Sequence, residues 1–541
     1  MKRFHPYIIM SLMAVLAFTS CDKFLDEKPD NRMDLKSQDD LKRLLVSAYP
    51  TFSPVYMLEM RSDNTNEYHN TAWSSTGRFQ DQAYSWTEIT DISVNDNPRN
   101  VWDGCYSAVA AANEVIKFVD SKSESERAQF GPQIGEALLC RAYAMFLLAN
   151  TFCMAYDEAT AGSELGLPYP LEPETKVGVH YERGTLAELY KKIDNDIQRG
   201  LLTVGNNYGD TPKFHFTPEA GYAFAARFYL YYRKYPEAKK YADMLLGKAP
   251  AAKLRDWASM AALSPNGNVQ SLAYISTAST ANILMMVVAS EWQLVNGVFL
   301  YGKKYAHGRR IAETETLKCR GPWGAGGGVD NNGMNYVVWS NSSLSNEFIN
   351  KIPDLRESDV ATGNFIPYTE YPVFNMDETL MVRAEANIMM GNYTDGLQDI
   401  NTELSKFHSL GKQITLADVQ KFYNDETGVA YYTPTSPTPR KKLNTSFTIE
   451  PKTQEPLLQC VLQLRRLITL GEGLRMQDVK RYGIEVYRIR LNEAQTVEAV
   501  TDQLRPGDPR YAVQIPSDVI AAGLQPNPMS LTTAPTEYKK Q

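Results

Sequence analysis

The 541-residue sequence has few of the residues and none of the short motifs that mark common metal sites and enzymes. Its six cysteines are widely spaced and include no Cys-x-x-Cys pair, which argues against a disulfide framework and against a zinc site. His-Glu-x-x-His, Gly-x-Ser-x-Gly, the Gly-x-x-x-x-Gly-Lys-Ser/Thr phosphate loop and a complete Gly-x-Gly-x-x-Gly are all missing. Catalysis by a pair of carboxylates, as in glycosidases, remains an alternative, because such pairs carry no local sequence motif. We therefore predict no metal and no cofactor.

The sequence also lacks a basic excess and a long hydrophobic run. Its 56 basic and 63 acidic side chains give a formal charge of −7, which argues against a partner with a phosphate backbone. Hydrophobic residues make up 43% and charged residues 22%, as in an ordinary globular protein. The apolar run Tyr7–Phe18 is too short to cross a hydrocarbon core of about 30 Å as a helix. No later stretch approaches the 18 or so apolar residues of a membrane-spanning helix.

The first residues have the pattern of a secretory signal peptide, in which Lys2 and Arg3 precede the apolar run. Small residues then lead to Cys21, and the segment 18–21 resembles a bacterial lipobox. The resemblance implies cleavage before Cys21 and acylation of that cysteine, and two or three acyl chains suffice for stable membrane anchoring. A plain signal peptide with a chance cysteine is the alternative. We predict a signal peptide over 1–20, a lipidated tether over 21–34 and a single body over 35–541.

Apolar residues recur at helical spacing along most of this body and predict a mainly α protein. The body is divided into an N-terminal region (35–250), a loop-rich insertion (251–377) and a C-terminal region (378–541). The predicted helices and helical hairpins cover 35–50, 101–118, 134–152, 182–202, 217–246 and 378–406. Alanine and tyrosine at the packing positions of the hairpins resemble degenerate tetratricopeptide repeats. Residues 51–100 and 407–456 are predicted to be long irregular loops, and short strands are predicted at 283–289 and 335–340.

The order of these features resembles the SusD/RagB family of outer-membrane lipoproteins along essentially the whole chain. Several segments carry the resemblance, and the most specific of them is Arg465-Arg466…Gly471-Glu472-Gly473-Leu474-Arg475…Asp478-Val479-Lys480-Arg481. The others are Trp102…Tyr106…Asn113, Gly135-Glu136-Ala137…Arg141-Ala142-Tyr143, Gly166-Leu167-Pro168, Tyr181-Glu182-Arg183-Gly184-Thr185, Arg383-Ala384-Glu385-Ala386 and Asp508-Pro509-Arg510. The charged residues within these segments are predicted to be paired scaffold contacts, because an unpaired buried charge is costly.

The resemblance implies a binding protein without catalytic activity. Such a protein is lipid-anchored at the outer membrane, faces the cell exterior, and passes a nutrient to a SusC-like TonB-dependent transporter. The nutrient is most often a glycan and sometimes a peptide. Two rival functions stay open: a surface glycosidase, which would release product from a polysaccharide, and a tetratricopeptide-type scaffold, which would bind only proteins.

Glycan capture needs flat aromatic faces for sugar rings and nearby polar groups for hydroxyls. Two regions of the sequence offer this mixture, and we predict ligand-binding residues in both. Trp73 and Trp323, flanked by small and flexible residues, are the better candidates for exposed rings, whereas Trp86 and Trp292 fit a core position equally well. The predicted set is Asp63, Asn64, Tyr68, Trp73, Arg78, Trp86 and Asn95 in the first region, and Trp292, Tyr301, Trp323, Tyr336 and Trp339 in the second.

Overall fold

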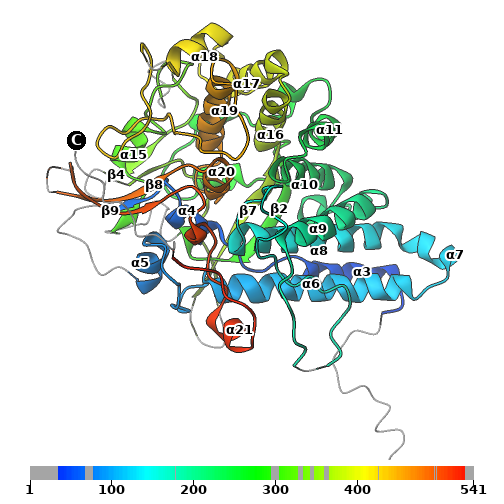
Figure 1. Ribbon diagram of the computed structural model, residues 1–541. Coiled ribbons are helices and arrows are strands. Elements are labelled where there is room, and N and C mark those ends of the chain that lie inside the picture. Colours follow the sequence, from blue (N-terminus) through cyan, green and yellow to red (C-terminus); the bar gives the residue numbers. More distant parts are fainter. Residues whose placement is uncertain are drawn as a thin grey trace, which may run out of the picture.

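Helices are the predominant secondary structure of the molecule and pack side by side (Figure 1). The computed structural model describes residues 35–67, 77–176, 178–293, 304–326, 333–341, 346–358, 363, 365–424, 426–492, 494 and 496–530. Within these ranges, no helix combines the length and the apolar character that crossing a bilayer requires. The predicted signal peptide and tether, including Cys21, lie outside them.

The predicted helical hairpins are present and pack side by side (Figure 1). Helices pack in the pairs α6–α8, α8–α9, α10–α11, α11–α16, α16–α17 and α16–α19. A short helix, α3 (Gln38–Leu45), lies against α6 and α8. The bounds of the longer helices are α6 Pro98–Asp120, α8 Gly131–Phe152, α9 Leu186–Leu201, α10 Pro218–Tyr231, α11 Tyr235–Leu246, α16 Met376–Met389, α17 Tyr393–Phe407 and α19 Gln454–Ile468.

Local sequence explains where the helices begin and how closely they pack. The Asn97 side chain accepts a hydrogen bond from the Asn100 backbone N–H at 2.9 Å, and Pro98 occupies the first turn of α6. Thr217 caps α10 in the same way. A Cβ atom at Gly221 of α10 would lie only 2.6 Å from the Leu201 side chain, so glycine permits the close approach of α9 and α10.

Strands are few and antiparallel. The largest sheet has the order β2–β7–β6, with β2 at Asn282–Ala289, β7 at Phe365–Asn375 and β6 at Leu355–Ser358. Met286 pairs with Tyr371 in the register of β2 and β7. The other strands form two-stranded ribbons: β1 (Asn66–Glu67) with β3 (Tyr305–Ala306), β4 (Trp339–Asn341) with β5 (Asn346–Phe348), and β8 (Val486–Leu491) with β9 (Val497–Leu504).

The segments predicted to be irregular contain short helices, so that prediction is partly wrong. These helices have five to seven residues, too few for a clear periodic signal. They include α4 (Val55–Arg61), α5 (Arg78–Tyr84), α12 (Trp257–Ala261), α13 (Val269–Tyr274), α15 (Arg309–Thr314) and α18 (Leu416–Phe422). The strand predicted at 283–289 is confirmed as β2, whereas the one at 335–340 is wrong for residues 335–338. Tyr336 there is buried and donates a hydrogen bond to the Leu317 carbonyl at 2.6 Å.

The charged residues predicted to be scaffold contacts are paired, which confirms that interpretation. Arg465 of α19 binds Asp478 of α20 (Arg475–Tyr482) at 2.6 Å and also contacts Glu385 of α16. Arg141 binds Asp196 at 2.6 Å between α8 and α9. The remaining pairs are Glu136 with His215, Glu472 with Lys351, and Arg475 with Asp63. Most of these pairs join segments that are distant in sequence, and they stabilise the scaffold.

Candidate functional site

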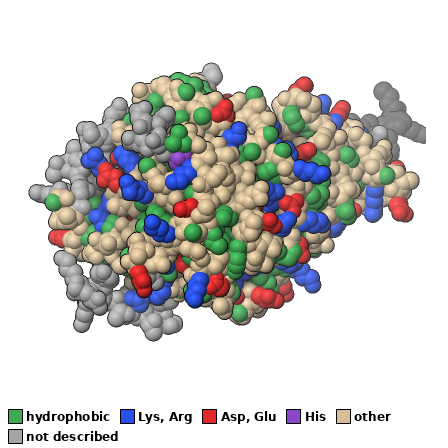
Figure 2. All heavy atoms as spheres, turned by 90° about the horizontal axis from the view of Figure 1, so that it is seen from above, with side chains coloured by type: hydrophobic (Ala, Val, Ile, Leu, Met, Phe, Trp, Pro, Cys, Tyr) green, Lys and Arg blue, Asp and Glu red, His purple; other side chains and the backbone are tan. Residues whose placement is uncertain are grey.

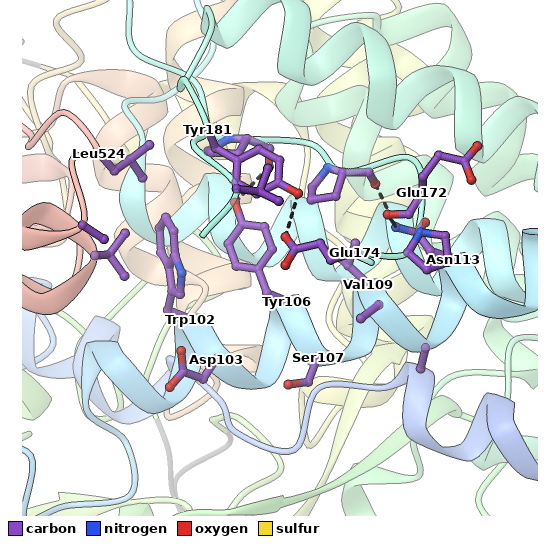
Figure 3. A pocket seen from close by; sticks show the side chains of 18 of the residues that line it. Trp102, Asp103, Tyr106, Ser107, Val109, Asn113, Glu172, Glu174, Tyr181 and Leu524 are labelled. Atoms are coloured by element: carbon purple, nitrogen blue, oxygen red, sulfur yellow. Dashed lines mark hydrogen bonds between the residues drawn. The ribbon is translucent and has the colours of Figure 1, made fainter. Parts of the chain in front are cut away.

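A groove of about 830 Å³ runs along one face of α6 (Figure 3). Its opposite wall is the segment 168–181, and the C-terminal helix α21 (Ser517–Ala521) with Leu524 closes one end. We call this hollow the α6 groove. It is lined by Trp102, Asp103, Tyr106, Ser107, Val109, Ala110, Ala111, Asn113, Glu114, Pro168, Pro170, Glu172, Pro173, Glu174, Val179, His180, Tyr181, Val519, Ala522 and Leu524.

Helix α6 supplies the floor of the groove because its lining residues recur at helical spacing. Trp102, Tyr106, Val109 and Asn113 are four, three and four residues apart, so they share one face of the helix. The centroids of the Trp102 and Tyr106 rings lie 4.9 Å apart, and the two ring planes are tilted by 47°. Figure 3 shows both rings pointing from α6 toward the opposite wall.

The opposite wall is held against α6 by hydrogen bonds that side chains of α6 donate to the backbone of the wall. The Tyr106 hydroxyl donates to the Pro168 carbonyl at 2.8 Å, and the Asn113 amide donates to the Pro170 carbonyl at 3.1 Å. Proline fixes its own φ and has no N–H group, so Pro168, Pro170 and Pro173 favour an extended wall that does not fold onto itself. The two hydrogen bonds from α6 therefore fix the position of this wall and with it the width of the groove.

The two ends of the wall are joined to each other and to the C-terminal segment. The Gly166 N–H donates to the Gly184 carbonyl at 2.9 Å, and a Cβ at Gly166 would lie 2.4 Å from the Thr185 carbonyl oxygen. Arg183 donates to the Gly166 carbonyl at 2.7 Å and to the Asn527 side chain at 2.7 Å. These contacts make 166–184 a closed loop with fixed ends.

The polar lining of the groove is acidic. Asp103, Glu114, Glu172 and Glu174 contribute four carboxylates, and none of the described lining residues is Lys or Arg. Tyr181 donates a hydrogen bond to Glu174 at 2.6 Å. Desolvation and this hydrogen bond raise the pKa of Tyr181 to about 12, so its hydroxyl stays neutral at physiological pH. The groove thus offers aromatic faces beside hydrogen-bond acceptors.

The two regions predicted from the sequence meet at another place, which we call the loop end. It is the part of the molecule where β1 pairs with β3 and where the rings of Tyr84 and Tyr305 stack at 4.3 Å. The Tyr305 hydroxyl donates to Asp81 at 2.6 Å. The structure therefore brings the predicted regions together, but the hollow described there measures only about 30 Å³.

Most of the predicted tryptophans at the loop end are buried. The prediction that the Trp323 ring is exposed is wrong, since only 1% of the residue is accessible. Trp86 and Trp292 occupy core positions, where their indole N–H groups donate to the carbonyls of Arg61 and Gly471 at 2.8 and 2.9 Å. Tyr336 is buried as described above. In this conformation these four rings present no face to a ligand.

The other predicted residues are placed as follows. Asn64 is buried, and Asp63 is half-buried with a nearly enclosed carboxylate. Asp63 binds Arg475 at 2.7 Å and Asn64 accepts a hydrogen bond from Arg466 at 2.8 Å, so both belong to the ionic core. Arg78 is exposed and donates to Thr90, and Asn95 is half-buried. The half-buried Trp339 ring lies 5.0 Å from that of Phe348. Tyr68, Trp73 and Tyr301 lie outside the described residues.

Sequence reasoning missed the α6 groove because its aromatic residues were interpreted as packing positions. Trp102 is only 7% exposed, yet it also lines the groove. Polar residues at Asp103, Ser107 and Glu114 interrupt the apolar face of α6, and that interruption was the available signal. Among the residues that the structure describes, no group of three His, Cys, Asp or Glu could hold a metal ion.

Comparison with known proteins gives a family match and a fold match. Residues 23–230 match the SusD-like family model described as starch-binding and associating with the outer membrane. No curated protein matches the sequence. A SusD superfamily protein of Bacteroides thetaiotaomicron VPI-5482 is 16% identical with a TM-score of 0.63, covering 91% of this chain and all of its own.

Two further solved structures have the same fold. A SusD-like carbohydrate binding protein of Bacteroides vulgatus ATCC 8482 is 14% identical with a TM-score of 0.58, over 90% of this chain and 97% of its own. A laminarin binding SusD-like protein is 15% identical with a TM-score of 0.51, over 91% of this chain and 100% of its own. The predicted mainly α, SusD-like fold is confirmed.

Proposed function

We propose that the chain is a cell-surface lipoprotein of the SusD/RagB family that binds an oligosaccharide and delivers it, uncleaved, to a SusC-like TonB-dependent transporter. The proposal is supported by the match of residues 23–230 to the SusD-like family model and by the SusD-like fold. The observation that supports binding most directly is the α6 groove. All of its floor and the whole opposite wall fall inside the segment that matches the family model.

The groove has the chemistry that oligosaccharide binding requires. The partly exposed rings of Tyr106 and Tyr181 can pack against the apolar face of a sugar, as aromatic side chains do in many ligand sites. Glu172, Glu174 and Ser107 offer acceptors to sugar hydroxyls. The volume of 830 Å³ lies within the range of roughly 300–1,000 Å³ that is typical of small-molecule sites.

The loop end is the second candidate surface for the same ligand. Trp339 and Arg78 lie at or near its surface, and Tyr68, Trp73 and Tyr301 belong to the segments beside it in sequence. We retain these five residues as proposed contacts. The two surfaces are separable by mutation because their residues do not overlap.

Binding is tested by a glycan array and by calorimetry on the 22–541 protein. We expect a neutral oligosaccharide to bind and Tyr181→Ala to weaken it about tenfold, while Trp73→Ala leaves it unchanged if the groove is the site. Tyr393→Ala, a half-buried tyrosine on α17, is the matched control. Loss of binding in Trp73→Ala alone would place the site at the loop end. Peptide binding without glycan binding would contradict the proposal.

Anchoring and the absence of catalysis are tested separately. Cys21→Ala should move the protein from the membrane fraction to the released fraction, because acyl chains are the proposed anchor. Incubation with the bound polysaccharide should release no shorter product. Co-purification with a SusC-like transporter from cells that carry both tests delivery, and its absence in gently solubilised membranes would contradict the proposed partnership.

A further inference from the structure

Two neighbouring hollows along α6 differ in their charged lining. The α6 groove is lined by four carboxylates and by no Lys or Arg, whereas the next hollow, of about 390 Å³, is lined by Lys117, Arg141 and Arg199 together with Asp120 and Glu172. Glu172 borders both hollows. Arg141 is already occupied, since it binds Asp196 at 2.6 Å. The aromatic part of the surface is therefore the acidic part.

Nearby cations offset only part of this negative charge. Arg99 lies outside the groove and binds Asp103 at 2.8 Å, but it is shared with Asp518 at 2.8 Å. Glu172 and Glu174 form no salt bridge with any residue in the described part of the chain. The hydrogen bond from Tyr181 to Glu174 supplies a neutral donor and no positive charge. A ligand in the groove consequently lies beside carboxylates that nearby cations offset only in part.

A carboxylate or sulfate on a ligand would enter this site against like charge. Both anions would lose water of hydration without gaining a cationic partner, which makes like-charge contact unfavourable in an interface. Neutral hydroxyl groups donate hydrogen bonds to the same carboxylates, and a protonated amine adds Coulomb attraction and contact with the faces of Trp102, Tyr106 or Tyr181.

From this geometry we infer that the α6 groove selects its ligand by charge: it accepts oligosaccharides of neutral or amino sugars and rejects those that carry uronate or sulfate groups. This inference rests on the proposed function, because it names the class of sugar for the same site. It concerns the groove only, so it stands or falls independently of the transporter and the lipid anchor.

The first experiment screens the 22–541 protein and its Tyr181→Ala variant on one array of neutral, amino and acidic glycans. We expect every glycan whose binding depends on Tyr181 to be neutral or amine-bearing. An acidic glycan that binds in a Tyr181-dependent way would overturn the inference. Binding that never depends on Tyr181 would also overturn it while leaving the proposed function intact, whereas an array without any binder would contradict the proposed function itself.

The second experiment measures the charge preference directly. The neutral glycan with the strongest binding is compared with its C6-oxidised uronate form by calorimetry, and we expect the uronate to bind about tenfold more weakly at low salt, with a smaller ratio at high salt. The Glu172→Gln, Glu174→Gln double variant removes two carboxylate charges. The affinity difference between the neutral glycan and its uronate form should therefore be smaller in this variant than in the wild type. The exposed pair Glu124→Gln, Glu426→Gln is the matched control and should leave the ratio unchanged. An unchanged ratio in the groove variant would overturn the inference.

Discussion

The α6 groove and the loop end contain similar residues but use them differently. Both hold tryptophan, tyrosine and aspartate. In the groove the rings project from one regular helix toward an extended wall and stay partly accessible (Figure 3). At the loop end the rings are enclosed by charged side chains, as Trp86 is by Arg488 at 4.0 Å and Arg510 at 5.6 Å. The type of residue alone therefore does not locate a binding surface; its neighbours decide whether the ring is available.

The largest effect expected is on stability at the loop end. Trp86→Ala should lower the free energy of unfolding by about 3–5 kcal/mol, because it removes a fully buried ring and its hydrogen bond to Arg61. Urea denaturation followed by circular dichroism measures the change. Tyr181→Ala is the comparison in the groove and should shift the midpoint little. Equal shifts in the two variants would contradict the contrast between the regions.

Replacing the buried carboxylate of Asp63 should have the next largest effect. Burial alone would raise the pKa of Asp63, but the attraction of Arg466 and Arg475 outweighs it and holds that pKa well below its usual range. Asp63→Asn should cost about 3 kcal/mol at pH 7, because it leaves buried cations uncompensated. A lowered folded-state pKa stabilises above the unfolded value near 4, so the difference from wild type should shrink below about pH 4. A constant difference from pH 7 to pH 3 would contradict this.

Asp96, which is also at the loop end, should respond to pH in the opposite direction. Burial raises its pKa to about 7, although Ser290 donates a hydrogen bond to its carboxylate at 2.6 Å. Because the folded state then binds more protons than the unfolded state between pH 4 and pH 7, stability should fall as pH rises through this window. In Asp96→Asn the free energy of unfolding should fall by about 2 kcal/mol less over this window than in the wild type. Thermal denaturation of both proteins at pH 5 and pH 8 tests it, and parallel curves would contradict it.

In the groove we expect effects on affinity and little effect on stability. Tyr181→Ala should weaken glycan binding about tenfold, equivalent to about 1.4 kcal/mol, through loss of an aromatic face. Trp339→Ala is the corresponding change at the loop end. Calorimetry with the same glycan compares them, and a larger loss in Trp339→Ala would reverse the assignment of the two surfaces.

The smallest effect is expected from Tyr106→Phe. The change keeps the ring on the groove floor and removes the hydrogen bond to the Pro168 carbonyl, which should cost about 1 kcal/mol of stability. Affinity should fall less than in Tyr181→Ala, because the ring face stays in place. A drop in affinity larger than that of Tyr181→Ala would show that the position of the wall, rather than the rings, controls binding.

The helices were predictable from the sequence, and so was the fact that their buried charges are paired. Both follow from the residues of a single segment. The spacing of apolar residues predicted the α10–α11 and α16–α17 hairpins, and the cost of burying an unpaired charge predicted partners for Arg141 and Glu385. The partners themselves, Asp196 and Arg465, could not be predicted because they depend on how distant helices pack.

Exposure of single aromatic rings was not predictable, and Trp323 shows why. Its flanking glycine and proline suggested an open loop. In the structure a Cβ at Gly321 would lie 2.3 Å from the Trp323 ring, so the missing side chain is what lets the indole fold back onto its own backbone. The same composition thus permits exposure or tight burial, and the choice depends on the path of the loop.

The absence of a nucleic-acid partner stays a prediction, and the distribution of surface charge bears on it. In the face shown in Figure 2, acidic and basic side chains are interspersed over the described residues rather than gathered by sign. A phosphate backbone needs a continuous basic stripe.

The C-terminal segment closes one end of the α6 groove: Leu524 and α21 border the groove, and Asn527 binds Arg183. The floor and the opposite wall of the groove come some 340 to 420 residues earlier in the sequence. The segment that closes the α6 groove is therefore synthesised long after the floor and the opposite wall. A chain truncated before Leu524 should form the helices of the scaffold and leave one end of the groove open.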